Sequence, residues 1–299
     1  MSEFALHGHD LFGEVVKPKA SGPVAERFTL PPFTILDARS GAWQERKRAW
    51  LSMGFRSEVG RLENSLGMSD AASLGEKDTS IFDPVAVELA VRWFSPVGGQ
   101  VVDPFAGGSV RGIVAGCLGR QYWGCDLRAE QVAANEVQSE DIAPAVRPVW
   151  ICGDSMETLA DAPAADFVFS CPPYGDLERY SDDPRDLSAM DWHAFVAAYK
   201  RIILRAVGKM KPDTFACFVV GDFRDGRGFY RNFVSTTIEA FEECGARLYN
   251  EAILATPVGT AAMRVTKQFE SGRKLAKTHQ NVLVFCKGDP RTAARKCGA

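Results

Sequence analysis

Between Ser80 and Gly288 the chain alternates short apolar segments of strand length with longer segments of helical periodicity. Strands are expected at residues 100–103, 121–125, 148–152, 166–171, 215–221, 247–255 and 281–287. Helices are expected at residues 84–94, 110–118, 129–137, 192–210 and 229–244. This alternation predicts an α/β fold whose mostly parallel, doubly wound sheet of seven strands binds ligands at the carboxyl ends of its strands. No helix is expected between the last two strands, so they can pair as an antiparallel hairpin.

The turn Cys171-Pro172-Pro173-Tyr174 directly follows the apolar run 165–170. Two prolines fix the backbone and remove two N–H donors, so the turn should leave the strand rigidly. The Tyr174 ring would then be held in one orientation, where it can stack on a planar molecule such as a nucleobase. Cys171 ends its strand, whereas most of the other cysteines lie inside apolar segments and are expected to be small buried hydrophobes.

A glycine-rich turn, Asp103-Pro104-Phe105-Ala106-Gly107-Gly108-Ser109, follows the first of these strands and precedes a helix. At such a turn the missing side chains let a ligand approach the backbone. Asp126 ends the next strand, 19 residues beyond Gly107, where a carboxylate accepts hydrogen bonds from both hydroxyls of a ribose. Asp154 follows the third strand and can accept from an adenine amino group. Three acids at three successive strand ends indicate one nucleoside-binding edge.

Together, residues 102–108, Asp126, Asp154 and the Cys-Pro-Pro-Tyr turn resemble the class I S-adenosylmethionine-dependent methyltransferases, specifically the DNA methyltransferases of the amino-modifying group. The likeness covers about Ser80 to Gly288. Residues 82–84 look like the family segment that closes over the methionine end of the cofactor, and residues 279–285 resemble its terminal strand. The resemblance implies a seven-stranded Rossmann-like fold, bound S-adenosylmethionine, and a target base rotated out of double-stranded DNA against Tyr174. The residues expected to contact the cofactor are Phe82, Asp83, Asp103, Phe105, Gly107, Gly108, Asp126, Leu127, Asp154 and Ser155.

The chain departs from the family pattern at two places. It reads Gly107-Gly108-Ser109 where the family usually has Gly-Ser-Gly, and it has Cys171 where amino-modifying enzymes carry Asp, Asn or Ser. Thiol sulfur is a weak acceptor for an exocyclic amine, but a thiolate is the nucleophile that C5 methylation of a pyrimidine requires. The sequence therefore favours a DNA cytosine methyltransferase, with C5 chemistry through Cys171 slightly ahead of methylation at N4 of cytosine or N6 of adenine.

The expected catalytic residues are Cys171, Pro172, Pro173 and Tyr174, together with two acids. Asp222 follows the strand 215–221 and, if protonated, could donate to N3 of cytosine. Glu178 lies in the segment after Tyr174. The alternatives are methylation of RNA or of a protein amide, which also uses Pro-Pro-Tyr turns, and, least favoured, a non-catalytic module that senses the cofactor or binds DNA.

The net charge of -3 is unevenly distributed along the chain. Two stretches, 39–61 and 264–277, each carry a net charge of +4. Trp43, Trp50 and Phe55 are interleaved with the first stretch, a pattern that suits contact with nucleic acid, although a solvated helix face is the alternative. The residues expected to contact DNA are Arg46, Lys47, Arg48, Arg264, Lys267, Arg273, Lys274 and Lys277.

The expected organisation is an amino-terminal extension at 1–79 with a basic and aromatic helix and a mobile connector, a catalytic domain at 80–290, and a tail at 291–299. DNA-contacting loops are expected at about 175–191 and 256–280, since too few residues separate Gly112 from Ser170 for a target-reading insert there. The longest apolar run is too short to span a bilayer, which predicts a soluble, cytoplasmic protein. The eight cysteines form no C-x-x-C pair, so no metal site or disulfide framework is expected.

Overall fold

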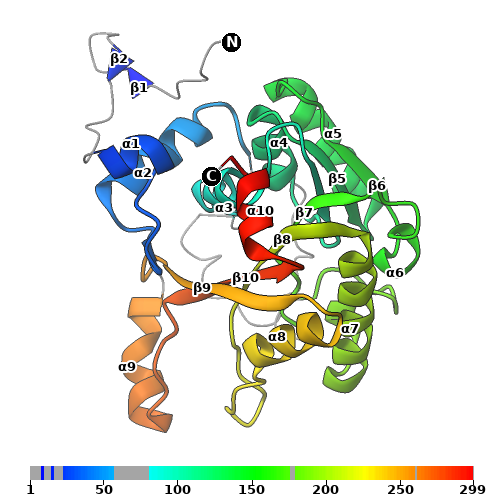
Figure 1. The fold of residues 1–299 in the computed structure, drawn as a ribbon. Coiled ribbons are helices and arrows are strands. Elements are labelled where there is room, and N and C mark those ends of the chain that lie inside the picture. Colours follow the sequence, from blue (N-terminus) through cyan, green and yellow to red (C-terminus); the bar gives the residue numbers. More distant parts are fainter. Residues whose placement is uncertain are drawn as a thin grey trace.

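The computed structural model describes residues 8–9, 15–16, 23–56, 81–175, 179–259 and 261–298, and an eight-stranded sheet forms its centre (Figure 1). Across the sheet the strands are ordered β3 (Ile35–Asp37), β9 (Arg247–Ala255), β10 (His279–Lys287), β8 (Met210–Val220), β7 (Ala165–Ser170), β4 (Gln100–Asp103), β5 (Gln121–Asp126) and β6 (Val149–Cys152). Two further short strands, β1 (Gly8–His9) and β2 (Val15–Val16), pair only with each other.

Strand directions confirm the predicted mostly parallel sheet. Strands β6, β5, β4, β7 and β8 run parallel to one another, whereas β10 runs antiparallel to both β8 and β9. A parallel sheet with one reversed strand inserted between the fifth and sixth strands of the core is the class I methyltransferase arrangement of the Rossmann-like fold. The last two strands, β9 and β10, pair antiparallel as predicted, but the connection between them contains a helix, α9 (Ala261–Gly272), that was not expected.

Helices cover both faces of the sheet. They are α1 (Pro23–Phe28), α2 (Gly41–Leu51), α3 (Pro84–Phe94), α4 (Val110–Cys117), α5 (Ala129–Ile142), α6 (Ser155–Thr158), α7 (Trp192–Lys209), α8 (Phe233–Glu243), α9 (Ala261–Gly272) and α10 (Pro290–Lys296). Along β8, Phe215, Cys217 and Val219 pack in the core with α2, α3 and α4, while Ala216 and Phe218 pack with α7 and α8. Because both faces are buried, the strand reads as a continuous apolar run.

Local sequence signals account for where several helices begin. Asp83 accepts a hydrogen bond from the backbone N–H of Val85, and Pro84 stands at the first helical position of α3. Asp191 caps α7 in the same way by accepting from His193 and Ala194. The predicted helix 84–94 has the observed bounds, and so do the predicted strands 100–103 and 247–255.

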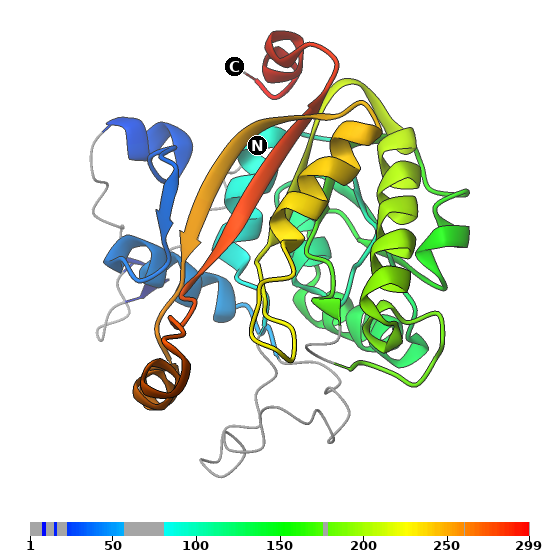
Figure 2. The same cartoon turned by 90° about the horizontal axis from the view of Figure 1, so that it is seen from below.

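The structure differs from the predicted element list in several places. An eighth strand, β3, comes from the amino-terminal region and pairs in parallel with β9, so this region extends the central sheet. Three residues are too few to show a periodicity, and pairing with β9 is what orders them. The expected loop 256–280 contains α9, which projects away from the sheet (Figures 1 and 2), and the expected tail contains α10. The connector predicted to be mobile lies outside the described residues.

No helix in the described part of the chain is long and apolar enough to cross a bilayer.

Candidate active site

A cavity of about 680 Å³ opens where the carboxyl ends of β4, β5, β6 and β7 meet the amino-terminal end of β10. β10 is antiparallel to its neighbours, so its first residues lie at the same edge as the last residues of the parallel strands. The sequence-predicted residues that line the cavity are Lys47, Phe82, Asp83, Phe105, Gly107, Gly108, Asp126, Leu127, Asp154, Ser155, Cys171, Pro172, Pro173 and Tyr174.

Asp103 is an exception among the predicted cofactor residues, because it is fully buried beneath the glycine-rich turn and does not line the cavity. Its Oδ2 accepts from Arg111 Nε at 2.6 Å and from the Tyr122 hydroxyl at 2.8 Å. Its Oδ1 accepts from the Ser170 hydroxyl at 2.5 Å and from the Phe105 N–H at 3.1 Å. With four donors from the protein, Asp103 is an internal anchor of the turn, and the expectation that it binds the cofactor is corrected.

Arg111 links Asp103 to the backbone of the glycine-rich turn. Besides pairing with Asp103, its guanidinium donates to the carbonyls of Phe105 and Ala106. Burial opposes the charge on Arg111, but the adjacent Asp103 raises its pKa above the ordinary value. The guanidinium also lies 5.0 Å from the centre of the Phe82 ring, which lines the cavity. A buried ion pair thus shapes the floor of the site.

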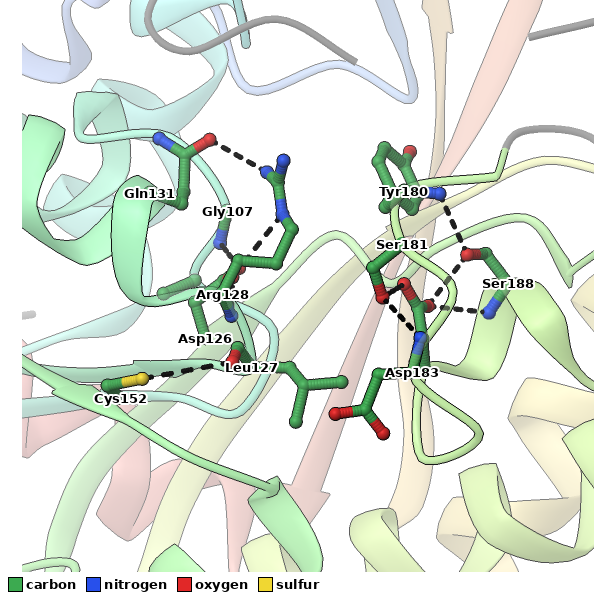
Figure 3. A network of polar contacts seen from close by, with 12 residues as sticks. Gly107, Asp126, Leu127, Arg128, Gln131, Cys152, Tyr180, Ser181, Asp183 and Ser188 are labelled. Atoms are coloured by element: carbon green, nitrogen blue, oxygen red, sulfur yellow. Dashed lines mark hydrogen bonds and ion pairs between the residues drawn. The ribbon is translucent and has the colours of Figure 1, made fainter. Parts of the chain in front are cut away.

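Asp126 has the geometry expected of a ligand-binding acid (Figure 3). The N–H of Gly107 donates to its Oδ2 at 3.0 Å, and the N–H of Arg128 donates to its Oδ1 at 2.9 Å. Gly107 has a φ of 50°, a left-handed conformation that favours glycine. Burial raises the pKa of Asp126, and these N–H donors oppose that rise. Each oxygen still has capacity for a second hydrogen bond, and the residue lines the cavity.

Asp154 and Ser155 lie at the end of β6, where α6 begins. Asp154 Oδ1 accepts from the Met156 N–H at 2.8 Å, which caps α6, and the residue lines the cavity. The hydroxyl of Ser155 donates to the Pro104 carbonyl at 2.5 Å and ties this turn to the glycine-rich turn. Leu127 completes the cavity wall between the two acids.

Phe82 and Asp83 reach the cavity from the start of α3. The Phe82 ring packs edge-to-face on Phe169, with ring centres 6.2 Å apart. Asp83 accepts from Trp43 Nε1 and lies 3.1 Å from Lys47 Nζ. Lys47, expected on a DNA-binding face, therefore lies at the cavity wall.

The Cys-Pro-Pro-Tyr turn brings a thiol and an aromatic ring to the same cavity. Cys171 is half-buried. Tyr174 packs edge-to-face against Phe223 and Phe233, each with ring centres 6.1 Å away, and burial raises its pKa well above the ordinary value. Its hydroxyl accepts from Gln280 Nε2 at 2.6 Å. The ring is thereby held from its edges and from its hydroxyl.

A loop at 179–191 closes one side of the cavity (Figure 3). The Tyr180 N–H donates to the Ser188 hydroxyl at 3.0 Å, and the Ser181 hydroxyl donates to Asp186 at 2.7 Å. The Arg128 guanidinium lies 5.8 Å from the centre of the Tyr180 ring, so the loop reaches the wall formed after β5. Glu178, an expected catalytic acid, lies outside the described residues.

Asp222 does not belong to the cavity lining. Its Oδ1 accepts from the N–H of Val234 at 3.1 Å, at the first turn of α8. This contact is that of a helix-capping acid.

The helix α2 contradicts the expected aromatic contribution to a nucleic-acid surface. Trp43 and Trp50 are each 1% exposed and Phe55 is also buried, so these rings belong to the core. Arg46 forms a two-point ion pair with Glu88, which is fully buried. The amphipathic helix uses its aromatic face for tertiary packing, which a basic and aromatic composition alone did not reveal.

Another surface carries exposed cations and aromatic rings. It is formed by the hairpin 222–231, by α9 and by the residues after α9 up to 277, and the hairpin and α9 lie at the same end of the molecule as each other (Figure 2). Lys267, Arg273 and Lys274 are exposed, and Lys277 is half-buried. In the hairpin, the guanidiniums of Arg224 and Arg227 lie 4.1 and 6.0 Å from the ring centres of Tyr230 and Phe229. Lys274 packs beside Gly228, which joins the two parts. Arg48 is exposed on α2, and the side chain of Arg264 lies outside the described residues.

Sequence reasoning missed several residues that line the cavity: Arg56, Arg128, Tyr180, Arg185 and Gln280. Arg128 follows Asp126-Leu127 directly, so its position after β5 was a usable signal. Gln280 lies in the segment identified as the terminal strand. Tyr180 and Arg185 belong to a loop without periodicity and carried no comparable signal.

No family model and no curated protein matches the sequence. Similar solved structures include TrmN from Thermus thermophilus, at 14% identity over 69% of this chain with a TM-score of 0.47; the match spans 49% of the TrmN chain. Precorrin-6y C5,15-methyltransferase from Geobacter metallireducens is similar at 10% identity over 69% of this chain and 87% of its own, with a TM-score of 0.45. Magnesium protoporphyrin IX methyltransferase from Synechocystis, solved with bound SAM, is similar at 10% identity over 80% of this chain and 89% of its own, with a TM-score of 0.44. The fold assignment rests on strand order and direction.

Proposed function

We propose that the chain is an S-adenosylmethionine-dependent DNA methyltransferase that acts on a base flipped out of the duplex. Cytosine is the favoured base, and C5 the favoured atom, through Cys171. The observation that carries the proposal is that the thiol and ring of the Cys-Pro-Pro-Tyr turn line the same cavity as Asp126 and Asp154.

The residues present fit the proposed cofactor. Asp126 offers acceptor capacity for the ribose hydroxyls, and Asp154 retains a carboxylate oxygen for an adenine amino group. Phe82 and the ion pair of Asp83 with Lys47 lie where the cofactor's methionine end is expected. The cofactor, when bound, supplies an electrophilic methyl group.

Cys171 and Tyr174 support a base as the methyl acceptor. The Tyr174 ring is fixed by Phe223, Phe233 and Gln280, so a planar base stacked on it would keep one orientation relative to Cys171. In C5 chemistry the thiolate sulfur bonds to C6 and C5 becomes nucleophilic. After methyl transfer a base removes the C5 proton and the C6–S bond breaks, which regenerates the thiolate.

The surface formed by the hairpin 222–231 and residues 261–277 supports DNA as the partner. It combines Lys267, Arg273 and Lys274 with the exposed rings of Phe229 and Phe269, which are 69% and 41% exposed. Cations suit the phosphate backbone, and exposed rings suit contact with bases. The same features would serve RNA, so dependence of binding on the 2′-hydroxyl separates the two nucleic acids.

Nucleoside analysis of DNA incubated with the enzyme and labelled cofactor tests the proposal. Labelled 5-methylcytosine is expected. N4-methylcytosine or N6-methyladenine would move the reaction to an exocyclic amine in the same cavity, and labelled RNA or protein without labelled DNA would refute DNA as the substrate.

Replacement of Cys171 separates the two chemistries further. If the thiolate attacks C6, Cys171→Ser abolishes turnover, and DNA that contains 5-fluorocytosine traps the wild-type enzyme because fluorine cannot leave C5 as a proton does. If Cys171 only orients an amine, Cys171→Ser stays active and no covalent complex forms. An active Cys171→Ser enzyme would end the C5 proposal.

A further inference from the structure

We propose that Gln280 is a positioning residue that turns the hydroxyl of Tyr174 toward the sulfur of Cys171, so that this hydroxyl stabilises the thiolate. The inference deepens the proposed C5 chemistry and rests on it for its catalytic meaning. The hydrogen-bond arrangement itself concerns the protein without cofactor or DNA.

In the contact between Gln280 and Tyr174, the amide of Gln280 is the donor and the phenolic oxygen of Tyr174 is the acceptor. A phenolic hydroxyl has one proton to donate and lone pairs that accept. Gln280 Nε2 donates to Tyr174 Oη at 2.6 Å, which occupies a lone pair and leaves the phenolic proton for another acceptor. Tyr174 is half-buried at the cavity wall, and a donor in such a position is normally satisfied by a group of the protein or by a bound molecule.

Among the residues that the structure describes, Cys171 can act as this acceptor. Its sulfur forms a hydrogen bond with the Tyr174 side chain, and both residues line the cavity together with Gln280. Besides burial, the neighbouring Cys171 sulfur and this hydrogen bond raise the pKa of Tyr174, so the hydroxyl keeps its proton and can donate it to the sulfur. The result is a chain from the Gln280 amide through Tyr174 Oη to Cys171 Sγ.

Within the described residues, further charged and titratable groups that act on Cys171 come from α4, from the end of β4 and from α7. The buried guanidinium of Arg111 on α4 interacts with it electrostatically, and Asp103 at the end of β4 partly offsets that charge. The hydroxyl of Tyr199 on α7 also lies within electrostatic range, but it bonds to Thr237. Tyr174 is therefore the neighbour whose proton can be directed at the sulfur by a single further side chain.

Gln280 is well placed for such a role because of its position in the sheet. It lies near the start of β10, opposite Leu254 of β9, and is separated from Tyr174 by 106 positions in sequence. Only the antiparallel insertion of β10 beside β8 brings its side chain to the Cys-Pro-Pro-Tyr turn.

The test is the pH dependence of alkylation of Cys171 by iodoacetamide, with the Cys171 peptide quantified by mass spectrometry. Exposed Cys152 in the same molecule is the internal reference. Tyr174→Phe removes the donor, Gln280→Leu removes the group that orients it, and Gln280→Glu places a carboxylate that accepts the phenolic proton. Each variant is expected to raise the midpoint for Cys171 by about one pH unit, which is about tenfold slower alkylation below the midpoint.

Gln131→Glu is the matched control, because it adds the same charge to the lining of the same cavity on the cofactor side. Gln131→Glu should shift the pH midpoint of Cys171 alkylation less than Gln280→Glu does. The alkylation of Cys152 should keep the same pH midpoint in every variant. If Gln280→Leu lowers the midpoint, Tyr174 donates to Gln280 in the native protein and the proposal is overturned. An unchanged midpoint in Tyr174→Phe overturns it as well, and that variant keeps the test valid if Gln280→Leu does not fold. Since the assay uses the enzyme alone, absence of methyl transfer to DNA would refute the proposed function without altering this result.

Discussion

Asp103→Asn should destabilise the protein strongly, although Asp103 itself does not line the cavity. Asp103 is fully buried and accepts from Arg111, Tyr122, Ser170 and Phe105. An amide at this position has one acceptor oxygen, and its NH₂ group faces donors, so the guanidinium of Arg111 loses its counter-charge inside the core. Removing one partner of a buried ion pair typically costs about 3 to 5 kcal/mol.

The assay is thermal and urea unfolding of the wild type and the variant. For a chain of 299 residues the unfolding entropy is about 0.6 kcal/mol per kelvin, so the expected loss corresponds to a fall in Tm of about 5 to 8 °C. The midpoint in urea should fall without a change in the slope m, because the surface exposed on unfolding is unchanged.

Asp126→Asn is the matched control, since Asp126 lines the cavity and its nearest charged partner, Arg128, is 3.8 Å away. It should lose cofactor affinity with a much smaller change in Tm. The reasoning fails if Asp103→Asn unfolds like the wild type but binds the cofactor weakly, because Asp103 would then be a ligand of the cofactor.

Asp126→Ala should weaken S-adenosylmethionine binding by about 1.5 to 3 kcal/mol, measured by calorimetry, and an unchanged affinity would reduce Asp126 to a turn-forming acid. The double variant Arg273→Ala, Lys274→Ala should reduce the slope of log K for DNA binding against log salt concentration by about 0.9 for each lost phosphate contact. Arg291→Ala on α10, beyond the opposite end of β10, should leave this slope unchanged. Burial disfavours the charge of Glu88, but its hydrogen bonds and ion pair with Arg46 lower its pKa below the ordinary 4.5. The contribution of this ion pair to the free energy of unfolding is therefore complete above pH 4.5 and is lost as the pH falls through the lower pKa of the folded state. The stability difference between wild type and Glu88→Gln should therefore narrow in acid urea titrations, and a constant difference down to pH 3 would contradict the pairing.

Much of the fold was predictable because its signals are local. Apolar runs of strand length and helical periodicity depend on neighbours in sequence, and they placed α3, β4 and β9 at their observed bounds. The Cys-Pro-Pro-Tyr turn was placed correctly at the end of β7 for the same reason.

The roles of individual acids were less predictable. Asp103 and Asp126 both end parallel strands, and nothing in their neighbouring letters distinguishes them. Arg111 and Tyr122, eight and 19 positions after Asp103, converge on it and bury it. Asp126 stays at the cavity because its partners are backbone N–H groups of two turns.

The alternation of elements, the edge of the sheet that carries the site, and the thiol and ring at the end of β7 could be predicted from the amino-acid sequence. The burial of Trp43 and Trp50 in the core, the pairing of β3 with the sheet, and the contact of Gln280 with Tyr174 become visible only in the folded molecule. The physical reason is range: periodicity and capping are interactions between near neighbours, whereas burial, strand insertion and side-chain pairing across 106 positions depend on which surfaces the completed sheet brings together.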